Sequence, residues 1–299
     1  MARRRHRPAR AGALVLALSY VPMNALDSIV SATSAPAESA TTPLRVALWQ
    51  TALAPAGDTA AALQRLAAAA QEAAARGAHW LITPEMALTG YLIDPAQVRA
   101  LAEPADGPLA QAVAALACQH RIGIAYGWPE WHPGGAAPYN AVQAIAPDGA
   151  RVGRHRKVHL FGRGDAERFS AAEAVAPPFP FNGWCIGLLI CYDVEQPAVV
   201  RALAQQGAHV IFAPTANMLP YDDAPLLTVP RLAAENGVAI AYANACGAEG
   251  ATVYGGLSTI CGPGGEIVAR AGRGEALLMA TLPARGLGPD RSTPAAAAR

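Results

Sequence analysis

The chain has 299 residues, of which 53% are hydrophobic and 15% are charged, and its formal net charge at pH 7 is +1. This is the composition of a globular protein with one large domain or two small ones, and its near-neutral charge argues against nucleic acid as a partner. No stretch approaches the roughly 20 apolar residues that a membrane-spanning helix needs, so we expect no membrane partner.

Cysteine and histidine usage argues against metal sites. The cysteines are odd in number and form no C-x-x-C pair: Cys118, Cys185, Cys191, Cys246 and Cys261. A disulfide framework and a structural zinc site are therefore not expected. His155 and His159 are four residues apart, but the segment HRKVH lacks the acidic residue of a metalloprotease motif. We expect no metal and no other cofactor.

Residues 1–43 have the character of a leader or linker, disordered or cleaved. The basic cluster MARRRHRPAR precedes the apolar run GALVLAL, and the small residues SATSAPAESA follow, which is the order of a secretory signal peptide. However, the apolar run is interrupted from Tyr20 onward, and Met23 is an alternative start. We favour a cytoplasmic protein, with export as the alternative if residues 1–43 act as a signal peptide.

From Leu44 the chain alternates between predicted strands and helices. In chain order the first half reads as strand LRVALWQ (44–50), helix TAAALQRLAAAAQEAAARG (59–77) closed by a glycine, strand AHWLITPE (78–85), helix 109–120 and strand IGIAYGW (122–128). NAVQAIA (140–146) and ARVGRHRK (150–157) flank PDG, a pattern that predicts a β-hairpin.

The second half continues this alternation. Its predicted strands are CIGLLIC (185–191), HVIFAP (209–214), VAIAYAN (238–244), GLSTIC (256–261), EIVAR (266–270) and ALLMATL (276–282). PAVVRALAQQG (197–207) and the stretch around PRLAAEN (230–236) predict two further helices. We therefore expect one domain over 44–285 and a flexible tail over 286–299.

Two segments of the chain echo each other. RGAHWLITPE (76–85) and QGAHVIFAPT (206–215) both combine a helix end, a glycine cap, a strand and a proline. The repeat indicates a pseudo-symmetric pair of sheets with helices outside. Glu85 then occupies the place that Thr215 has in the second unit, and both should lie at the C-terminal edge of their strands, as Cys191 does.

Three residues at strand ends are candidates for chemistry. Cys191 ends an apolar run before a turn, although a free cysteine is most often a buried small hydrophobe. Glu85 follows a buried strand and a proline, although it could serve only as an acid in the first turn of a helix. Lys157 follows the hairpin, within a basic cluster where a solvated lysine is the ordinary outcome. The combination of the three favours a functional site.

The segments LITPEMALTGY, HRKVHLFG and GLLICYDVEQP resemble the three signature segments of the nitrilase (carbon–nitrogen hydrolase) superfamily, and RALAQQGAHVIFAPTAN continues the likeness. The resemblance covers the chain from about Leu44 to Leu282. It implies an α/β fold, an α-β-β-α sandwich of two pseudo-symmetric mixed sheets with outer helices. It also implies a Glu-Lys-Cys catalytic triad, here Glu85, Lys157 and Cys191.

These residue types suit the implied chemistry. A thiol with a pKa near 8.5 needs a base to become a nucleophile, and Glu85 can accept its proton and later donate it to the leaving amine. Attack on an amide creates an oxyanion, which Lys157 and the backbone N–H of Tyr192 can stabilise.

The family usually has another acidic residue after the lysine. In FGRGDAERFSAAE both Asp165 and Glu167 qualify, and we favour Asp165. We expect Tyr192, Asp165 and Asn217 to contact the substrate. The family commonly has an aromatic residue, a proline and a glutamate after the nucleophile turn, whereas this chain has Gln196, Pro197 and Ala198, which puts the packing and substrate width of that turn in doubt.

Within the superfamily, PTANMLPYDD and YANACGAE most resemble the branch that acts on aliphatic and amino-acid amides. Asp222 and Asp223 are candidates for attracting a cationic α-amino group, against the ordinary alternative of two solvated loop aspartates. The predicted function is a cysteine amidohydrolase that releases ammonia from a small carboxamide, in a homodimer or larger homo-oligomer. The alternatives are a nitrilase or N-carbamoyl-amine hydrolase with the same triad, acyl transfer to another amine, and a non-catalytic binding module.

Overall fold

The computed structural model describes residues 42–55 and 57–284, and every structural statement below concerns these residues. The predicted tail at 286–299 and almost all of the predicted leader at 1–43 lie outside the described residues. Within them, no helix combines the length and the apolar character that crossing a membrane requires.

The first sheet has six strands. In spatial order they are β14 (Ala276–Leu282), β1 (Leu44–Gln50), β2 (Trp80–Ile82), β3 (Gly123–Glu130), β4 (Tyr139–Ile145) and β5 (Arg151–Arg156). The pairs β1–β2 and β2–β3 are parallel, whereas β14–β1, β3–β4 and β4–β5 are antiparallel. The β4–β5 pair confirms the hairpin that was predicted around PDG. The sheet is therefore mixed.

The second sheet also has six strands. In spatial order they are β6 (Phe179–Phe181), β7 (Trp184–Leu188), β8 (Val210–Thr215), β9 (Ala239–Asn244), β12 (Thr259–Cys261) and β13 (Ile267–Arg270). Read in this order, both sheets show the same succession of pairings: one antiparallel, two parallel, then two antiparallel. β2 and β8, which carry the echoed segments, both come third. This equivalence confirms the predicted pseudo-symmetric pair of mixed sheets.

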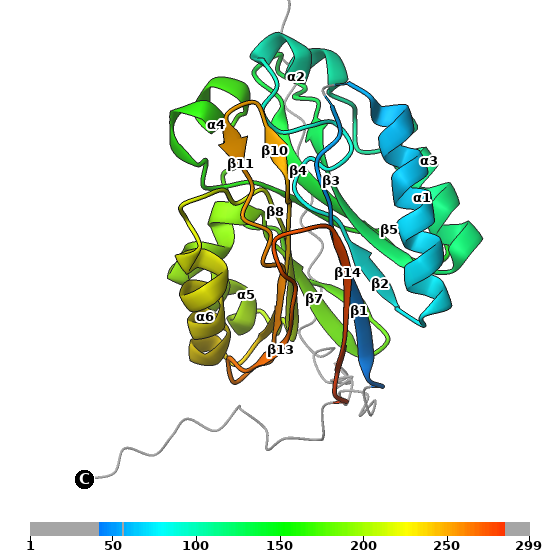
Figure 1. Ribbon diagram of the computed structural model, residues 1–299, viewed down its shortest axis with the longest axis vertical. Coiled ribbons are helices and arrows are strands. Elements are labelled where there is room, and N and C mark those ends of the chain that lie inside the picture. The colour runs from blue at the N-terminus through cyan, green and yellow to red at the C-terminus, as the bar shows by residue number, and fades with distance from the viewer. Residues whose placement is uncertain (1–41, 56, 285–299) are drawn as a thin grey trace, which may run out of the picture. The chain divides into compact units, whose positions relative to one another are not determined.

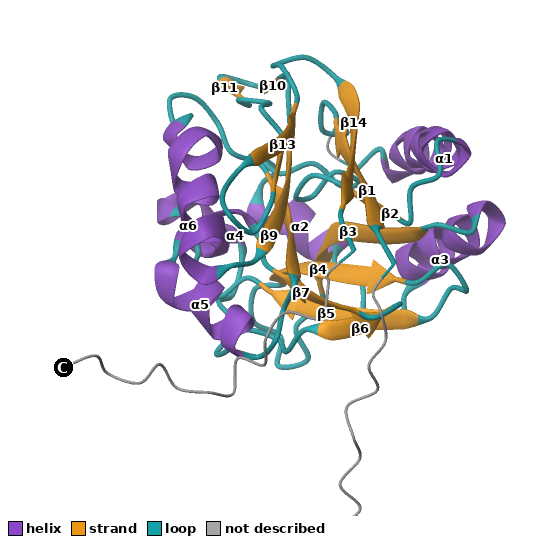
Figure 2. Ribbon diagram, turned by 90° about the horizontal axis from the view of Figure 1, so that it is seen from below, coloured by secondary structure: helices purple, strands orange, loops and turns teal. Residues whose placement is uncertain are grey.

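The helices cover the outer faces of the two sheets (Figure 1). The longer ones are α1 (Thr59–Ala75), α3 (Pro108–His120), α5 (Pro197–Gln205) and α6 (Val229–Asn236). Figure 2 shows α1 and α3 on one side of the strands and α5 and α6 on the other. The predicted α-β-β-α sandwich with outer helices is thus confirmed.

Each layer boundary has its own apolar core. Between the sheets, alternate strand residues such as Val46, Ile82, Val210 and Phe212 pack together. Trp80 lies at the centre of this core, with its ring centroid 5.6 Å from that of Phe212. The opposite faces of the same strands pack on the helices: Leu81 of β2 belongs to the same apolar cluster as Leu66 of α1. Burial on both faces explains why these strands read as continuous apolar runs.

Several short elements surround the strand ends. They are α2 (Pro95–Leu101), α4 (Gly162–Arg168), β10 (Ala248–Glu249), β11 (Thr252–Val253), a 3₁₀-helix over Cys191–Glu195 and a π-helical turn over Ala224–Thr228. β10 and β11 form a small antiparallel pair separate from the two main sheets. The strand predicted at 78–85 is shorter than expected, because Pro84 has no N–H for the β-ladder. The chain thereby turns before Glu85.

Candidate active site

Cys191 lies at the sharp turn that follows β7. It begins the 3₁₀-helix, its backbone φ is 46°, and only 8% of its surface is exposed. A left-handed conformation at a non-glycine residue costs about 1–3 kcal/mol and is found most often at functional sites. Met86, directly after Glu85, has a φ of 52° and shares this strain. Two of the three candidate segments therefore hold strained turns.

Glu85 joins the two echoed units. Its backbone N–H donates to the carbonyl of Thr215 at 3.3 Å, so the ends of β2 and β8 meet at this residue. One carboxylate oxygen accepts a hydrogen bond from the N–H of Ala216 at 3.0 Å. The other accepts one from the side-chain amide of Asn140 at 2.6 Å. Glu85 is buried and held from three directions.

Lys157 lies directly after β5 and is fully buried. Its Nζ donates to Oε1 of Glu85 at 2.9 Å and to Oδ2 of Asp165 at 2.7 Å. Its backbone N–H donates to the carbonyl of Asn140 at 2.8 Å, which fixes the start of its side chain. The lysine thus bridges two buried carboxylates.

The sequence offered two candidates, Asp165 and Glu167, for the further acidic residue after the lysine. In the structure it is Asp165 that lies beside Lys157. Its carboxylate also accepts hydrogen bonds from the hydroxyl of Tyr91 at 2.6 Å and from the N–H of Phe161 at 2.9 Å. Glu167 instead pairs with Arg163 at the protein surface. Both acids belong to α4, but Asp165 points into the protein interior and Glu167 lies at the surface.

The environment separates the pKa values of the two carboxylates. Burial raises the pKa of Glu85, and the nearby charge of Lys157 opposes this only in part. Burial also acts against the charged form of Asp165, but Lys157 and the hydrogen bonds to this carboxylate lower its pKa below the usual value. Two acids with pKa values shifted apart can take different parts in proton chemistry. Asp165 is suited to remain ionised, and Glu85 to exchange a proton.

The pKa shifts of Lys157 and Cys191 are consistent with these roles of Asp165 and Glu85. Burial opposes the charge of Lys157, but Glu85 and other neighbours raise its pKa well above the ordinary value. Burial and the charge of Glu85 raise the pKa of the Cys191 thiol, against the opposing effect of Lys157. The thiol is therefore protonated at rest. A thiolate becomes favourable only as Glu85 takes up the proton, because the two groups titrate as a pair.

Asp193 ties the segment after Lys157 to the nucleophile turn. Its buried carboxylate accepts hydrogen bonds from the N–H of His159 at 2.8 Å and of Val158 at 3.3 Å. The imidazole of His155 lies 2.9 Å from the same carboxylate, and that of His159 lies 3.0 Å from it. Because Asp193 is two residues after Cys191, these bonds fix the separation between the thiol and the lysine.

A cavity of about 250 Å³ opens beside the thiol. Its lining consists of Tyr91, Phe161, Cys191, Tyr192, Glu195, Ala216, Asn217, Met218 and Tyr221. The predicted contacts Tyr192 and Asn217 thus line it, whereas Asp165 lies behind Tyr91. Asn217 is held in place, because its N–H donates to the side chain of Asn244 at 2.7 Å and its amide donates to the carbonyl of Tyr221 at 2.8 Å.

The two loop aspartates do not line this cavity. Asp222 is paired with Arg273 at 2.6 Å, so its charge is already matched. The idea that Asp222 or Asp223 meets a cationic substrate group is therefore not supported. The carboxylate that does line the cavity is Glu195, which the sequence reading missed.

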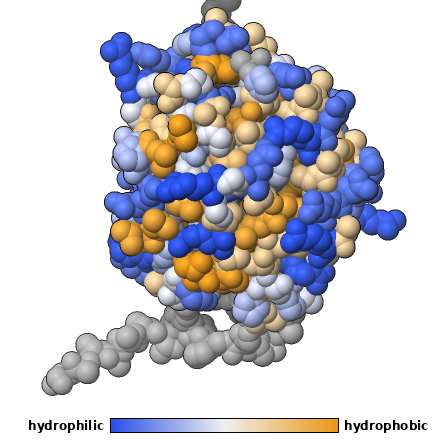
Figure 3. All heavy atoms as spheres, in the orientation of Figure 1, coloured by the Kyte–Doolittle hydropathy of each residue, from blue (hydrophilic) through white to orange (hydrophobic). Residues whose placement is uncertain are grey.

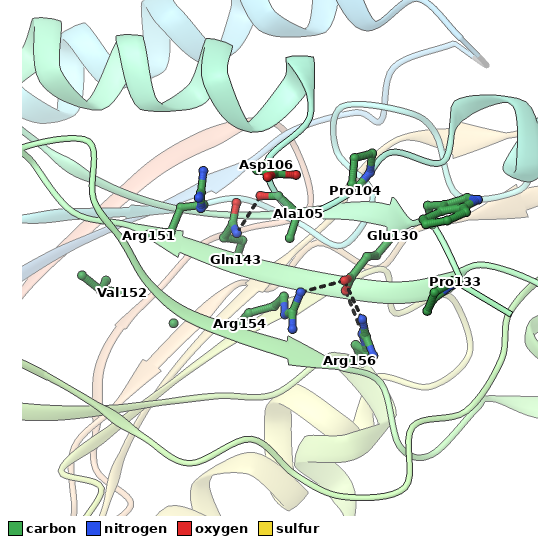
Figure 4. A pocket seen from close by; sticks show the side chains of 12 residues that line it. Pro104, Ala105, Asp106, Glu130, Pro133, Gln143, Arg151, Val152, Arg154 and Arg156 are labelled. Atoms are coloured by element: carbon green, nitrogen blue, oxygen red, sulfur yellow. Dashed lines mark hydrogen bonds and ion pairs between the residues drawn. The ribbon is translucent and has the colours of Figure 1, made fainter.

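A larger cavity of about 580 Å³ lies elsewhere, beside β3 and β5 (Figure 4). Glu130 sits between two arginines there, 2.9 Å from Arg154 and 2.7 Å from Arg156. Neither Cys191 nor Glu85 lines it. The chemistry therefore belongs to the smaller cavity.

Within the described part of the chain, no group of three or more His, Cys, Asp and Glu side chains could hold a metal ion.

Other residues of the site were not singled out from the sequence. Tyr91 closes the segment LITPEMALTGY, so the signal was present within a segment that was already recognised. Asn140 carried no local signal, because its role arises only when β4 comes beside Glu85. Glu195 follows Cys191 by four residues and could have been suggested by the single turn of helix between them.

Comparison with known proteins shows which family this chain resembles. Residues 45–291 match the family model described as carbon-nitrogen hydrolase. A "hydrolase in pqqF 5' region" of Pseudomonas protegens is 46% identical over 249 residues, covering 83% of this chain and 86% of that protein. An (R)-stereoselective amidase of a Pseudomonas species is 33% identical over 196 residues, which cover 65% of this chain and 69% of that protein.

Among solved structures, a variant of the amidase from Nesterenkonia sp. AN1 in complex with acrylamide superposes with a TM-score of 0.75. The two chains are 31% identical, and the match covers 83% of this chain and 93% of the other. The likeness thus extends over nearly the whole sandwich.

Proposed function

The chain belongs to the carbon–nitrogen hydrolase family, in the amidase-like branch of the nitrilase superfamily, and on that premise we propose that it hydrolyses a small carboxamide to a carboxylate and ammonia. It is a hydrolase that acts on carbon–nitrogen bonds. The finer proposal concerns the substrate, an aliphatic or amino-acid amide, and the residues that act on it.

One observation carries the proposal. The buried Lys157 lies 2.9 Å from Glu85 and 2.7 Å from Asp165, and this group adjoins the cavity that contains the Cys191 thiol. A proton acceptor, a fixed cation and a nucleophile are the parts that acyl transfer through cysteine requires. The acrylamide complex of the related amidase supports an amide as the ligand.

In the first half of the proposed reaction, the amide carbonyl enters the cavity beside Cys191. The thiol proton moves to Glu85 as sulfur bonds to the carbonyl carbon, and the carbonyl oxygen becomes an oxyanion. Lys157 and the backbone N–H of Tyr192 stabilise this charge. Glu85 then gives the proton to the amide nitrogen, the carbon–nitrogen bond breaks, and ammonia leaves a thioester on the cysteine.

The second half hydrolyses the thioester. Water occupies the place that ammonia left, and Glu85 takes one of its protons as the oxygen bonds to the carbonyl carbon. Collapse of the tetrahedral species breaks the carbon–sulfur bond and releases the carboxylic acid. The proton on Glu85 returns to sulfur. Asp165 stays ionised throughout and keeps Lys157 protonated and in position.

The test is ammonia release from a panel of short carboxamides, the corresponding nitriles and N-carbamoyl compounds. The proposal predicts that the amide gives a higher kcat/KM than the nitrile with the same side chain. A nitrile favoured tenfold, equivalent to about 1.4 kcal/mol of transition-state stabilisation, would reverse the assignment. Preference for an N-carbamoyl compound would likewise replace the amide as substrate.

We further propose that the protein is a homodimer or larger homo-oligomer. Figure 3 shows hydrophobic patches between hydrophilic residues on one face of the molecule. Large apolar side chains are exposed, including Leu227 at 63% and also Leu219 and Val253, whose backbones are joined by a hydrogen bond. Exposed apolar surface of this kind often marks an interface. Sedimentation of a single species at the chain mass of 30.7 kDa would contradict this proposal.

A further inference from the structure

Glu195 is a carboxylate of the cavity that the proposed reaction does not use. It lines the same cavity as Cys191 and is half-buried. Among the described residues, no hydrogen bond or ion pair joins its side chain to another residue. Burial raises its pKa and Lys157 partly offsets this effect. A half-buried carboxylate without a protein partner, facing a substrate cavity, is available to a ligand.

The rest of the cavity wall is mainly aromatic. Tyr91, Phe161, Tyr192 and Tyr221 all line it. The ring of Phe161 lies 5.4 Å from the rings of both Tyr192 and Tyr221, in edge-to-face arrangements. The faces of aromatic rings attract cations, especially where water is excluded. A carboxylate among such rings suits an ammonium group.

The charge balance around the cavity also favours a cation. The single lysine, Lys157, is already shared between Glu85 and Asp165. Glu195 adds a further negative charge that no side chain of the described residues neutralises by direct contact. A cavity whose wall carries uncompensated negative charge attracts cations and disfavours anions.

The backbone sets a suitable spacing. Cys191 and Glu195 are the first and last residues of one 3₁₀-helix. Such a helix rises about 2.0 Å per residue, so the two Cα atoms are separated by about 8 Å along its axis. Because both residues line the same cavity, a short substrate that has its carbonyl carbon at the thiol can extend toward the carboxylate.

We propose that Glu195 binds the ammonium group of a cationic carboxamide, such as an amino-acid amide, and is the specificity-determining residue of this cavity. This inference rests on the proposed amidase function and deepens it, because it selects cationic amides over neutral ones. It also replaces Asp222 and Asp223 as the recognition group, since neither lines the cavity.

The test compares glycinamide with propionamide, which differ by an ammonium in place of a methyl group. At pH 7 most of the glycinamide is cationic, because α-amino groups have pKa values of about 7.7–8.0. We expect Glu195→Gln and Glu195→Ala to lower the ratio of the two kcat/KM values about 10–100-fold, mainly through the KM for glycinamide. The matched control, Asp223→Asn, should leave this ratio unchanged.

An unchanged ratio in the Glu195 variants would overturn the inference, and so would equal losses on both amides, which indicate a purely structural role. Calorimetric binding of glycinamide to Cys191→Ser, with and without Glu195→Gln, gives a second readout that needs no turnover. Weaker binding without the carboxylate supports the inference, and equal binding contradicts it. If the wild-type protein released no ammonia from either amide, the proposed function would fail, while this binding measurement would still decide the role of Glu195.

Discussion

The carboxylate of Asp165 lies 2.7 Å from Nζ of Lys157, in a site where neither side chain reaches solvent. The ion pair keeps Lys157 charged beside the thiol, although burial alone would favour the neutral amine. Burial raises the pKa of Glu85, the second partner of the lysine; the charge of Lys157 opposes this effect and the charge of Asp165 adds to it. The ion pair therefore modulates the proton affinity that burial gives to the proposed base.

Removing the charge of Asp165 should destabilise the protein. We expect Asp165→Asn to lower the free energy of unfolding by about 3–5 kcal/mol, because one partner of a buried charge pair is lost. Activity should fall with it. The matched control is Glu167→Gln, two residues away on the surface of α4, which should change stability by no more than about 0.5 kcal/mol. Denaturant unfolding measures both, and similar effects of the two changes would contradict the placement of Asp165.

Glu85→Gln should abolish most turnover without unfolding the protein. The amide retains the size of the side chain but cannot accept the thiol proton. We therefore expect kcat to fall by about 10²–10⁴-fold. Steady-state ammonia release gives the rate, and circular dichroism checks the fold. Activity within tenfold of wild type would remove Glu85 from the role of base.

The pH dependence of turnover should report the raised pKa of Glu85. As the pH falls through that value, the carboxylate becomes protonated and can no longer accept the thiol proton. With propionamide, which carries no charge, the acid limb of kcat/KM should therefore have its midpoint above the ordinary glutamate value of about 4.3. An acid limb at or below pH 4.3 would disagree with a buried, protonatable Glu85.

Asp193 should contribute stability that depends on pH. Burial alone would raise its pKa, but His155 and the N–H of His159 hold it below the usual value. The ionised carboxylate therefore stabilises the fold above its unfolded pKa of about 3.9, and this contribution is lost as the pH falls through the lower, folded value. Asp193→Asn should destabilise the protein most at neutral pH. A deficit that stayed constant down to pH 3 would contradict this account.

Alkylation should distinguish Cys191 from the exposed Cys118. Only Cys191 has a carboxylate and a lysine beside it, so iodoacetamide, itself an amide, should label Cys191 in a reaction that substrate slows. The rate at which Cys118 is labelled should not depend on substrate, so this cysteine serves as the internal control. Peptide mass spectrometry follows both sites. Equal protection of the two cysteines would indicate that substrate acts on the whole protein and not at the cavity.

Much of the fold could be predicted because strands such as β1, β3 and β8 are buried over nearly their whole length and read as apolar runs. β1 and β14 have the predicted bounds, since their apolar runs end at polar or proline residues. The helix α4 was missed because Gly162 and Gly164 give its sequence the character of a loop. The helix is stabilised by tertiary contacts, such as the hydrogen bond that the side chain of Arg168 donates to the carbonyl oxygen of Tyr91.

The candidate site was predictable where one segment carried its own signal. Glu85, Lys157 and Cys191 each stand in a recognisable stretch at a strand end. Asn140 and Glu195 do not, because their importance depends on which strands and turns come together in space. The choice between Asp165 and Glu167 likewise required the orientation of α4, which local sequence does not set.

The central claim, that Cys191 is the nucleophile, is tested most directly by ammonia release from a Cys191→Ser variant that retains the wild-type thermal unfolding midpoint. The hydroxyl is far less acidic than the thiol, and Glu85 is too weak a base to ionise it. The account predicts a rate at least about 10⁴-fold below wild type, while Cys118, Cys185, Cys246 and Cys261 changed singly to Ala each keep more than about a tenth of the activity, as packing residues should. A Cys191→Ser variant that retained most of its turnover would contradict the covalent mechanism.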